Sequence, residues 1–198
     1  ELIQIIKSEE KICKYLDIPI QHSRDSILKA MNRNSTESSI RLTINKLRKE
    51  IPDIAIRTTL ITGFPGETKE DFNHLLQFVE DTGCARLGVF AYSKEEGTVA
   101  ADLPKQVRKD TKENRKEKIM AAQREISLRK NQALTEQTIE VLVEEINEDG
   151  SYIGRSYMDA PEIDNAVLFT SEKPLKLGNF VSVYINDAYD YDLVGIVK

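Results

Sequence analysis

The chain has only two cysteines, Cys13 and Cys84, which lie far apart in dissimilar surroundings. They form neither a metal-binding spacing nor a disulfide framework, which favours a reducing, cytoplasmic location. No stretch approaches the roughly 20 apolar residues that a membrane span needs, so no membrane partner is expected. The opening residues 1–6 fit the end of a helix rather than a secretory signal, so we expect a piece of a longer chain.

Positive charge is scarce in the last third of the chain. Residues 135–198 contain four Lys/Arg against thirteen Asp/Glu, which leaves a net charge of −9. Residues 1–134 carry 24 basic and 20 acidic side chains, and ten of the basic ones fall within residues 105–134. Such asymmetry predicts a domain boundary and different partners for the two parts.

Apolar runs and helical patterns alternate through residues 1–104. The runs at 15–20, 55–62 and 86–92 predict strands, and apolar spacings of three and four between them predict helices. One helix should be capped at Ser35 or Thr36, and the next should start at Thr68 with Asp71 in capping-box position. This alternation is typical of right-handed βαβ units in a parallel sheet. Three strands are too few to close a barrel, so we expect half of a larger β/α (TIM-like) barrel, with a small open sheet as the alternative. Its exposed edge strand predicts domain swapping or dimer formation.

The pattern changes twice after residue 104. Residues 105–134 predict a long, charged connecting helix. From residue 135 the apolar period becomes two, with a hairpin turn at 147–150. The predicted short strands are 138–146, 152–157, 166–169, 180–185 and 193–197. Five such strands in residues 135–198 predict a small all-β barrel of OB-like size.

Two loops at strand ends are candidate walls of one ligand site. Gly63–Thr68 follows the second strand and Lys94–Thr98 the third. In a parallel sheet both loops leave the same edge, where α/β folds place their ligands. The glycines would let backbone approach a ligand, and the following helix N-terminus could hold a carboxylate or phosphate. A tight, well-capped turn explains the first loop equally well.

Several single residues admit both a functional and a structural interpretation. Arg57 lies inside an apolar strand, and a buried guanidinium needs a partner, by default a neighbouring acid rather than a ligand carboxylate. His22 follows a strand end and could serve a site or make a structural hydrogen bond. Tyr92 and Ser93 could meet a ligand or simply end a strand. The acids within 159–164 favour a solvated loop over a binding surface. No catalytic triad, metal cluster or pair of catalytic carboxylates emerges.

Four stretches resemble the radical S-adenosylmethionine methylthiotransferases, in the family's order and over essentially the whole chain. They are Tyr15–His22, Leu28–Arg33, Arg57–Thr68 and Tyr92–Thr98. The resemblance implies the second half of a radical SAM β/α barrel followed by a TRAM domain. It also implies S-adenosylmethionine and two four-iron four-sulfur clusters in the full-length enzyme. One cluster cleaves S-adenosylmethionine reductively to a deoxyadenosyl radical, and the other takes part in delivering the methylthio group.

The sequence departs from the family pattern at the clusters. The CxxxCxxC motif and the N-terminal cluster-binding domain are absent, so no metal ligand or catalytic residue is expected here, and the piece alone should be inactive. The resemblance implies that six residues surround S-adenosylmethionine: Gln21, Arg57, Gly63, Glu67, Tyr92 and Ser93. Among them Arg57 would face the carboxylate, backbone near Gly63 would approach the cofactor, and Tyr92 would lie near the adenosine.

Two branches of the family differ in substrate. One methylthiolates the β-carbon of an aspartate in ribosomal protein S-twelve, and the other modifies isopentenyladenosine in transfer RNA. Gly154–Asp164 and the loop 95–98 resemble the protein branch, which implies substrate contacts from Arg155, Asp159, Glu162 and Asp164. A domain with a net charge of −9 repels RNA phosphates and attracts a basic protein, which favours the same branch. RNA contact stays open for the helix at 105–132, and a substrate-binding module without turnover is a further alternative.

Overall fold

The computed structural model describes residues 1–198, which divide into two compact units. The first unit comprises Glu1–Gln4 and Leu16–Gln123, and the second Ile5–Tyr15 and Arg124–Lys198. The division falls inside the long helix α6 (Lys109–Gln132). The segment limits at 104 and 134 that composition suggested stay predictions.

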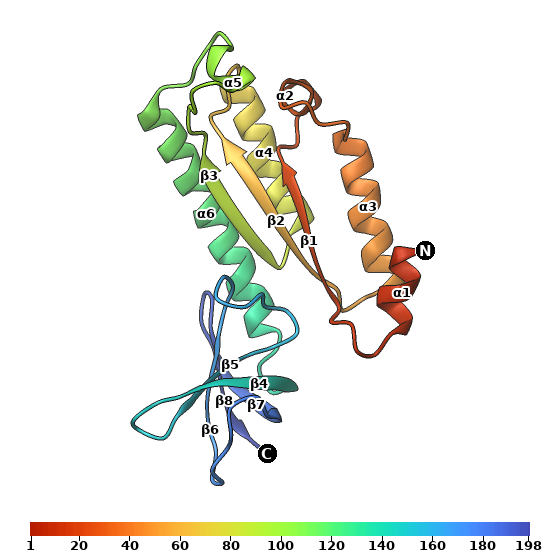
Figure 1. Cartoon of the computed structure of the whole chain (residues 1–198), viewed down its shortest axis with the longest axis vertical. Coiled ribbons are helices and arrows are strands. Elements are labelled where there is room, and N and C mark those ends of the chain that lie inside the picture. Colours follow the sequence, from red (N-terminus) through yellow and green to blue (C-terminus); the bar gives the residue numbers. More distant parts are fainter. The chain divides into compact units, whose positions relative to one another are not determined.

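The first unit is built on a three-stranded sheet in the order β1-β2-β3. The strands are β1 (Tyr15–Gln21), β2 (Ala55–Thr62) and β3 (Arg86–Ala91). β2 and β3 pair in parallel, and β1 runs in the same direction (Figure 1). The parallel sheet and all three strand positions are therefore confirmed.

Helices α3 (Glu37–Glu50) and α4 (Lys69–Thr82) connect these strands, and each begins at a cap that the sequence predicted. The Thr36 hydroxyl accepts a hydrogen bond from Ser39 N at 3.2 Å, and that of Thr68 from Asp71 N at 3.1 Å. Both are capping boxes, which satisfy backbone donors left free at a helix start. The shorter helices are α1 (Leu2–Ser8), α2 (Asp25–Ala30) and α5 (Val99–Asp102).

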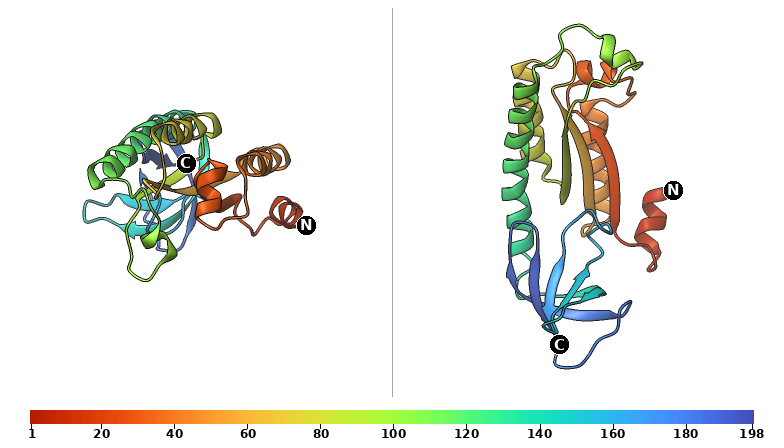
Figure 2. Two further views of the ribbon diagram at one scale, coloured as in Figure 1. Left: turned by 90° about the horizontal axis from the view of Figure 1, so that it is seen from above. Right: turned by 60° about the vertical axis from the view of Figure 1, so that its left-hand side comes forward.

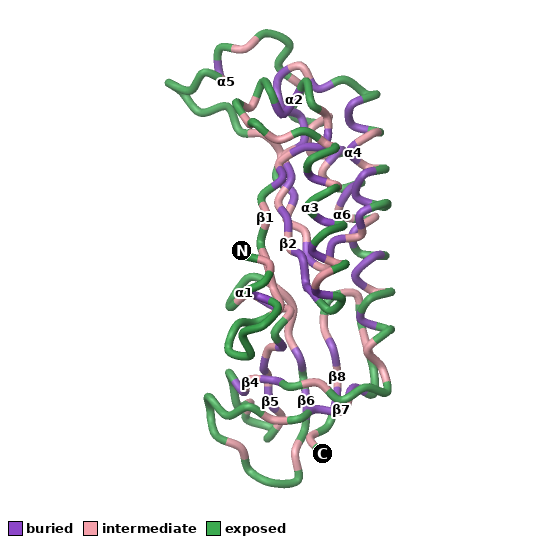
Figure 3. The backbone as a smooth tube through the Cα atoms, turned by 90° about the vertical axis from the view of Figure 1, so that its right-hand side faces the viewer, coloured by how far each residue is buried: buried purple, intermediate pink, exposed green.

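Helices cover only one face of this sheet. Figure 3 shows α3, α4 and α6 on the same side of the strands. Along β2 the residues facing the helices, such as Thr58 and Leu60, are buried, whereas Arg57 and Ile61 on the other face are partly exposed. A doubly wound sheet carries helices on both faces, but a β/α barrel carries them only outside. The one-sided cover thus supports the half-barrel prediction over a doubly wound open sheet.

Helix α6 starts later than the sequence suggested, at Lys109 instead of residue 105. Lys105 follows Pro104 and adopts a left-handed backbone (φ 60°), which a right-handed helix cannot include. The first half of α6 lies beside α4 (Figure 2), with the Arg115 guanidinium 5.4 Å from the Phe72 ring centre. None of the helices combines the length and apolar character that crossing a membrane requires.

The second unit contains the predicted five-stranded barrel, which is closed and has the strand order β4-β5-β6-β8-β7. Its strands are β4 (Thr138–Ile146), β5 (Tyr152–Arg155), β6 (Val167–Thr170), β7 (Phe180–Ala188) and β8 (Leu193–Val197). Inward side chains form one core: Val141, Val143, Tyr152, Val167, Phe169, Val183, Ile185 and Leu193. Gly154 and Gly195 allow close strand approach, because a Cβ there would lie 2.2 and 2.4 Å from neighbouring carbonyl oxygens.

Candidate functional site

The carboxyl ends of β1, β2 and β3 meet at one edge of the sheet. At this edge Tyr92 N donates a hydrogen bond to Thr62 O at 2.9 Å, so the loops after β2 and β3 begin side by side. The predicted juxtaposition of the two loops is therefore confirmed.

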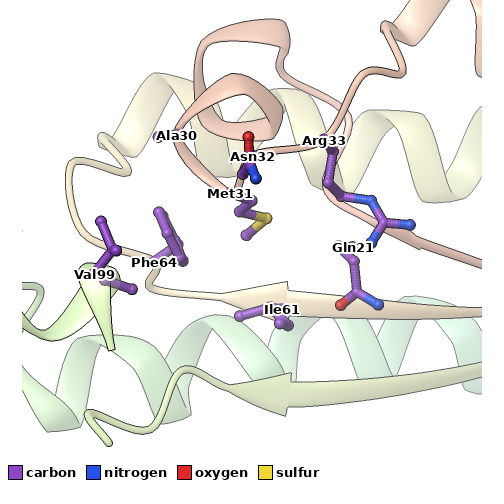
Figure 4. A pocket seen from close by; sticks show the side chains of 9 residues that line it. Gln21, Ala30, Met31, Asn32, Arg33, Ile61, Phe64 and Val99 are labelled. Atoms are coloured by element: carbon purple, nitrogen blue, oxygen red, sulfur yellow. The ribbon is translucent and has the colours of Figure 1, made fainter. Parts of the chain in front are cut away.

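A cavity of about 530 Å³ lies at this edge. Its lining residues are Gln21, Ala30, Met31, Asn32, Arg33, Ile61, Phe64, Val99 and Ala100. Figure 4 shows Met31 above Ile61, with Phe64 on one side and Gln21 on the other. The walls are mainly apolar with a few polar groups, and both volume and lining are typical of small-molecule sites.

Two polar residues of the cavity have unusual backbone conformations. Gln21 has φ 73° and Asn32 has φ 57°, both in the left-handed region. Asn tolerates this region, but an unbranched side chain such as Gln rarely adopts it, and strained residues cluster at functional sites. Next to them, Arg33 Nη2 donates a hydrogen bond to Pro19 O at 2.5 Å.

The side chain of Glu67 lies beneath the loop after β2, fully buried. Its carboxylate accepts hydrogen bonds from Gly63 N at 2.7 Å and from Arg115 Nη1 at 2.6 Å. His22 Nε2 lies 3.5 Å from Glu67 Oε2, the oxygen that accepts the hydrogen bond from Gly63 N. Glu67 therefore binds groups within the chain and does not line the cavity.

His22 is buried beside this carboxylate. Its Nδ1 accepts a hydrogen bond from Arg24 N at 2.9 Å, whereas its buried Nε2 has no hydrogen-bond partner and lies 3.5 Å from Glu67 Oε2. The Nδ1 contact is a structural hydrogen bond, and a site role for His22 stays a prediction.

Gly63 and Tyr92 are joined by Lys112 of α6. Gly63 has φ 71°, and a Cβ there would lie 2.3 Å from Lys112 Cγ, so glycine is required twice over. Lys112 Nζ donates to Tyr92 O at 2.9 Å and lies 4.6 Å from the Tyr92 ring centre. Burial lowers the pKa of Lys112. The Tyr92 ring packs edge-on against Phe64 at 5.3 Å, and its buried hydroxyl has no hydrogen-bond partner.

The remaining two predicted cofactor residues are engaged elsewhere. Arg57 Nη1 donates to Asp17 Oδ2 at 2.7 Å on the uncovered face of the sheet, so the neighbouring acid expected by default is present. Ser93 Oγ donates to Glu95 Oε1 at 2.7 Å in an exposed loop. Of the six predicted residues, only Gln21 lines the cavity directly, while Gly63, Glu67 and Tyr92 support the segment that carries Phe64.

The cavity includes residues that the sequence analysis did not assign to the site. Met31, Asn32 and Arg33 follow α2, while Ile61 and Phe64 flank the end of β2. All five lie within stretches that carried the family resemblance, which was the available signal.

The predicted substrate residues of the second unit mostly contact the chain itself. Arg155 Nε donates to Glu144 Oε1 at 2.6 Å, and buried Asp159 accepts from Ser156 Oγ at 2.7 Å. This Ser156–Asp159 turn ends β5 at Arg155 rather than at residue 157. Asp164 accepts from Ala160 N at 2.9 Å and from the Tyr15 hydroxyl at 3.1 Å. Glu162 is exposed, with φ 61°.

An iron–sulfur cluster finds no ligand set among the residues of this chain. Cys13 is exposed and Cys84 is buried, and no group of His, Cys, Asp and Glu side chains could hold a metal ion.

Both units contain a stretch that matches a known protein family. Residues 1–79 match the Radical SAM superfamily and residues 137–197 the TRAM domain. Over its whole length the chain is 52% identical to the protein named "Ribosomal protein uS12 methylthiotransferase RimO" of Acetivibrio thermocellus, of which it covers 44%. Over 98% of its length it is 51% identical to the protein of the same name from Desulforamulus reducens and 52% identical to that from Geobacter sulfurreducens, again covering 44% of each.

The chain thus spans less than half the length of these relatives. Its parallel half-barrel and closed five-stranded barrel occur in the same order as the two matched domains. The chain thus joins part of a radical SAM domain to a TRAM domain and is similar over its whole length to the relatives named RimO.

Proposed function

We propose that this chain is part of an enzyme that transfers a methylthio group to the β-carbon of an aspartate in ribosomal protein uS12. Identity of about half over the whole chain to several proteins named for that activity supports the proposal. The transfer RNA branch receives no comparable support. An enzyme that modifies a ribosomal protein works where ribosomes are, so a cytoplasmic location follows.

The observation that carries the proposal is the cavity at the strand ends. Its apolar walls, formed by Met31, Ile61 and Phe64, suit a flat adenine ring, and its polar groups suit the ribose and the amino-acid part of S-adenosylmethionine. When bound beside a reduced iron–sulfur cluster, this cofactor supplies the radical chemistry of the family. The residues described here would bind and orient the cofactor and keep water from one side of it.

We assign the cluster ligands to a part of the protein outside this chain, because none of its own residues fit them. The chain alone should therefore turn nothing over. Two clusters in the longer protein are what the family resemblance implies. Purified chain 1–198, incubated anaerobically with iron, sulfide, a reductant, S-adenosylmethionine and uS12, should leave uS12 unmodified.

The partner of the TRAM barrel is proposed to be basic. The net charge of −9 in residues 135–198 would attract a basic ribosomal protein and repel RNA. The basic residues of α6 could make a separate contact with RNA phosphates.

A gene deletion distinguishes the two branches. Mass spectrometry of uS12 from the deletion strain should show loss of the methylthio group, while the methylthiolated nucleosides of transfer RNA stay unchanged. The reverse result would assign the chain to the transfer RNA branch.

A further inference from the structure

The outer surface of the TRAM barrel carries an apolar row that crosses three strands. Ile153 of β5 pairs with Leu168 of β6, and Leu168 pairs with Val194 of β8. Paired residues point to the same side of a sheet, and each of these three has a core residue next to it in the chain (Tyr152, Val167, Phe169 or Leu193), so the row faces outward. Leu168 is 38% exposed, and the other two are partly exposed.

Acidic residues close both ends of this row. Ile153 pairs with Glu145 of β4, and Val194 pairs with Asp187 of β7. Both acidic side chains belong to exposed residues. A segment lying along the row would therefore contact aliphatic side chains in the middle and carboxylates at its ends.

A hollow of about 430 Å³ continues from the β4–β5 end of the row, because Glu145 and Ile153 also line it. Three further acidic residues line the hollow: Glu144, Glu162 and Asp164. The single cation in the lining, Arg155, is paired with Glu144. The hollow is thus acidic overall and joined to an apolar surface.

One lining residue has an unused hydrogen-bond donor. The side-chain nitrogen of Asn165 is buried and has no hydrogen-bond partner. A buried donor without a partner is unfavourable, and the carbonyl oxygen of an extended peptide is a suitable acceptor.

We propose that Glu145, Ile153, Leu168 and Val194, with the adjoining hollow, form a docking surface for an extended basic segment of a protein. Aliphatic side chains of the segment lie on the row, and a lysine or arginine enters the hollow. This inference rests on the proposed function, which makes a basic ribosomal protein the substrate, and it adds the place on the barrel that holds that protein.

Charge complementarity selects this occupant. Proteins that bind RNA do so largely through Lys and Arg contacts to phosphates, whereas the row and the hollow present carboxylates and one already paired arginine. Aliphatic side chains such as Leu168 also offer bases no stacking surface comparable to an aromatic ring.

Binding of purified uS12 to the whole chain, measured by fluorescence anisotropy, tests the surface. The two test variants are Leu168→Glu in the row and Glu145→Lys at its end. Leu42→Glu, on a 70% exposed leucine of α3, matches the first substitution. Glu172→Lys, on an exposed acid between β6 and β7, matches the second in net charge. Circular dichroism checks that each variant is folded. If a strand variant unfolds, Glu162→Lys, which lies in an exposed loop lining the hollow, replaces it as the test variant.

Each test variant should raise the Kd for uS12 by about tenfold and each control by less than about twofold, as expected when a few central residues dominate an interface. The wild-type affinity should also fall as salt rises. Equal weakening by Glu145→Lys and Glu172→Lys would overturn the inference, since charge would then act without a defined surface. The inference would also be overturned if Leu168→Glu bound uS12 with wild-type affinity, or if the wild-type chain did not bind uS12. A third contrary result is binding of poly-uridine RNA by the wild type that Leu168→Glu abolishes.

Failure of this inference can be told apart from failure of the proposed function. If uS12 is modified in cells whose longer protein carries Leu168→Glu as efficiently as in the wild type, the docking surface is refuted and the function stands. If uS12 is unmodified in wild-type cells although the chain binds it through these residues, the proposed function is refuted instead.

Discussion

Glu67 and Arg115 form a buried ion pair between the loop after β2 and helix α6, with 2.6 Å between the carboxylate oxygen and Nη1. Their side chains are 0% and 11% exposed. Because the same carboxylate accepts the Gly63 N–H, the pair fixes the segment that presents Phe64 to the cavity. Removal of one partner leaves the other as an uncompensated buried charge.

Glu67→Gln should lower the free energy of unfolding by about 3 kcal/mol, since Arg115 then stays buried without a counter-charge. Urea unfolding of the chain, followed by circular dichroism, measures this change. The double variant Glu67→Gln/Arg115→Met should recover part of the loss. A loss below about 1 kcal/mol for the single variant would show that the pair does not hold the loop.

Gly63→Ala should destabilise the first unit by about 2 kcal/mol or more, because a left-handed residue gains a Cβ that meets the Lys112 side chain. Gly66→Ala is the matched control: its φ is 89°, but no atom lies within 4 Å of the added Cβ. The control should cost only the backbone term, about 1 kcal/mol. Equal effects in thermal unfolding would argue against the close approach of Lys112.

The pKa of Asp71 gives a pH-dependent prediction. Burial raises this pKa, but hydrogen bonds from Thr68 N, Arg24 and the Thr68 hydroxyl outweigh burial and hold it below the usual value. A carboxyl whose pKa is lower in the folded state stabilises the fold above its unfolded pKa and loses that effect as pH falls through the folded pKa. Asp71→Asn should thus cost about 1 kcal/mol at neutral pH, and the difference should shrink below about pH 4.

Unfolding of both proteins at a series of pH values measures this difference. Glu70→Gln, which removes an exposed carboxylate from the same helical turn, controls for net charge. A difference between wild type and Asp71→Asn that stays constant down to about pH 2 would contradict the prediction.

Gln21→Gly should separate stability from function. Glycine relieves the left-handed strain at φ 73°, so the variant should be as stable as the wild type or more stable by up to about 1 kcal/mol. The same change removes the amide from the cavity, so turnover in the longer protein should fall. A variant that keeps full turnover would remove Gln21 from the cofactor site.

The first unit should associate through the edge of its sheet. An unpaired edge strand offers free backbone donors and acceptors to a second copy. Size-exclusion chromatography of the chain should show a dimer whose proportion rises with concentration. A monomer at all concentrations would contradict this expectation.

The elements that the sequence predicted well depend on short-range patterns. The strand 55–62 and the caps at Thr36 and Thr68 follow from local periodicity and from residues three positions apart, and the structure reproduces them. The closed barrel follows from the period-two pattern of the last 60 or so residues, whose glycines allow close strand contacts.

The details of the site depend on contacts between distant residues. Glu67 meets Arg115 across 48 positions of sequence, so its turn away from the cavity has no local signature. The cavity combines residues 30–33 with residues 61 and 64, which only the folded sheet edge brings together. The start of α6 depends on a left-handed Lys105, which charge and periodicity do not reveal.

The most direct test of the central claim is anaerobic reconstitution of the longer protein that contains this chain. After incubation with iron, sulfide, S-adenosylmethionine and a reductant, purified uS12 is analysed by mass spectrometry. The account predicts one methylthio group in place of hydrogen on an aspartate of uS12. Unmodified uS12, together with methylthiolation of transfer RNA under the same conditions, would contradict it.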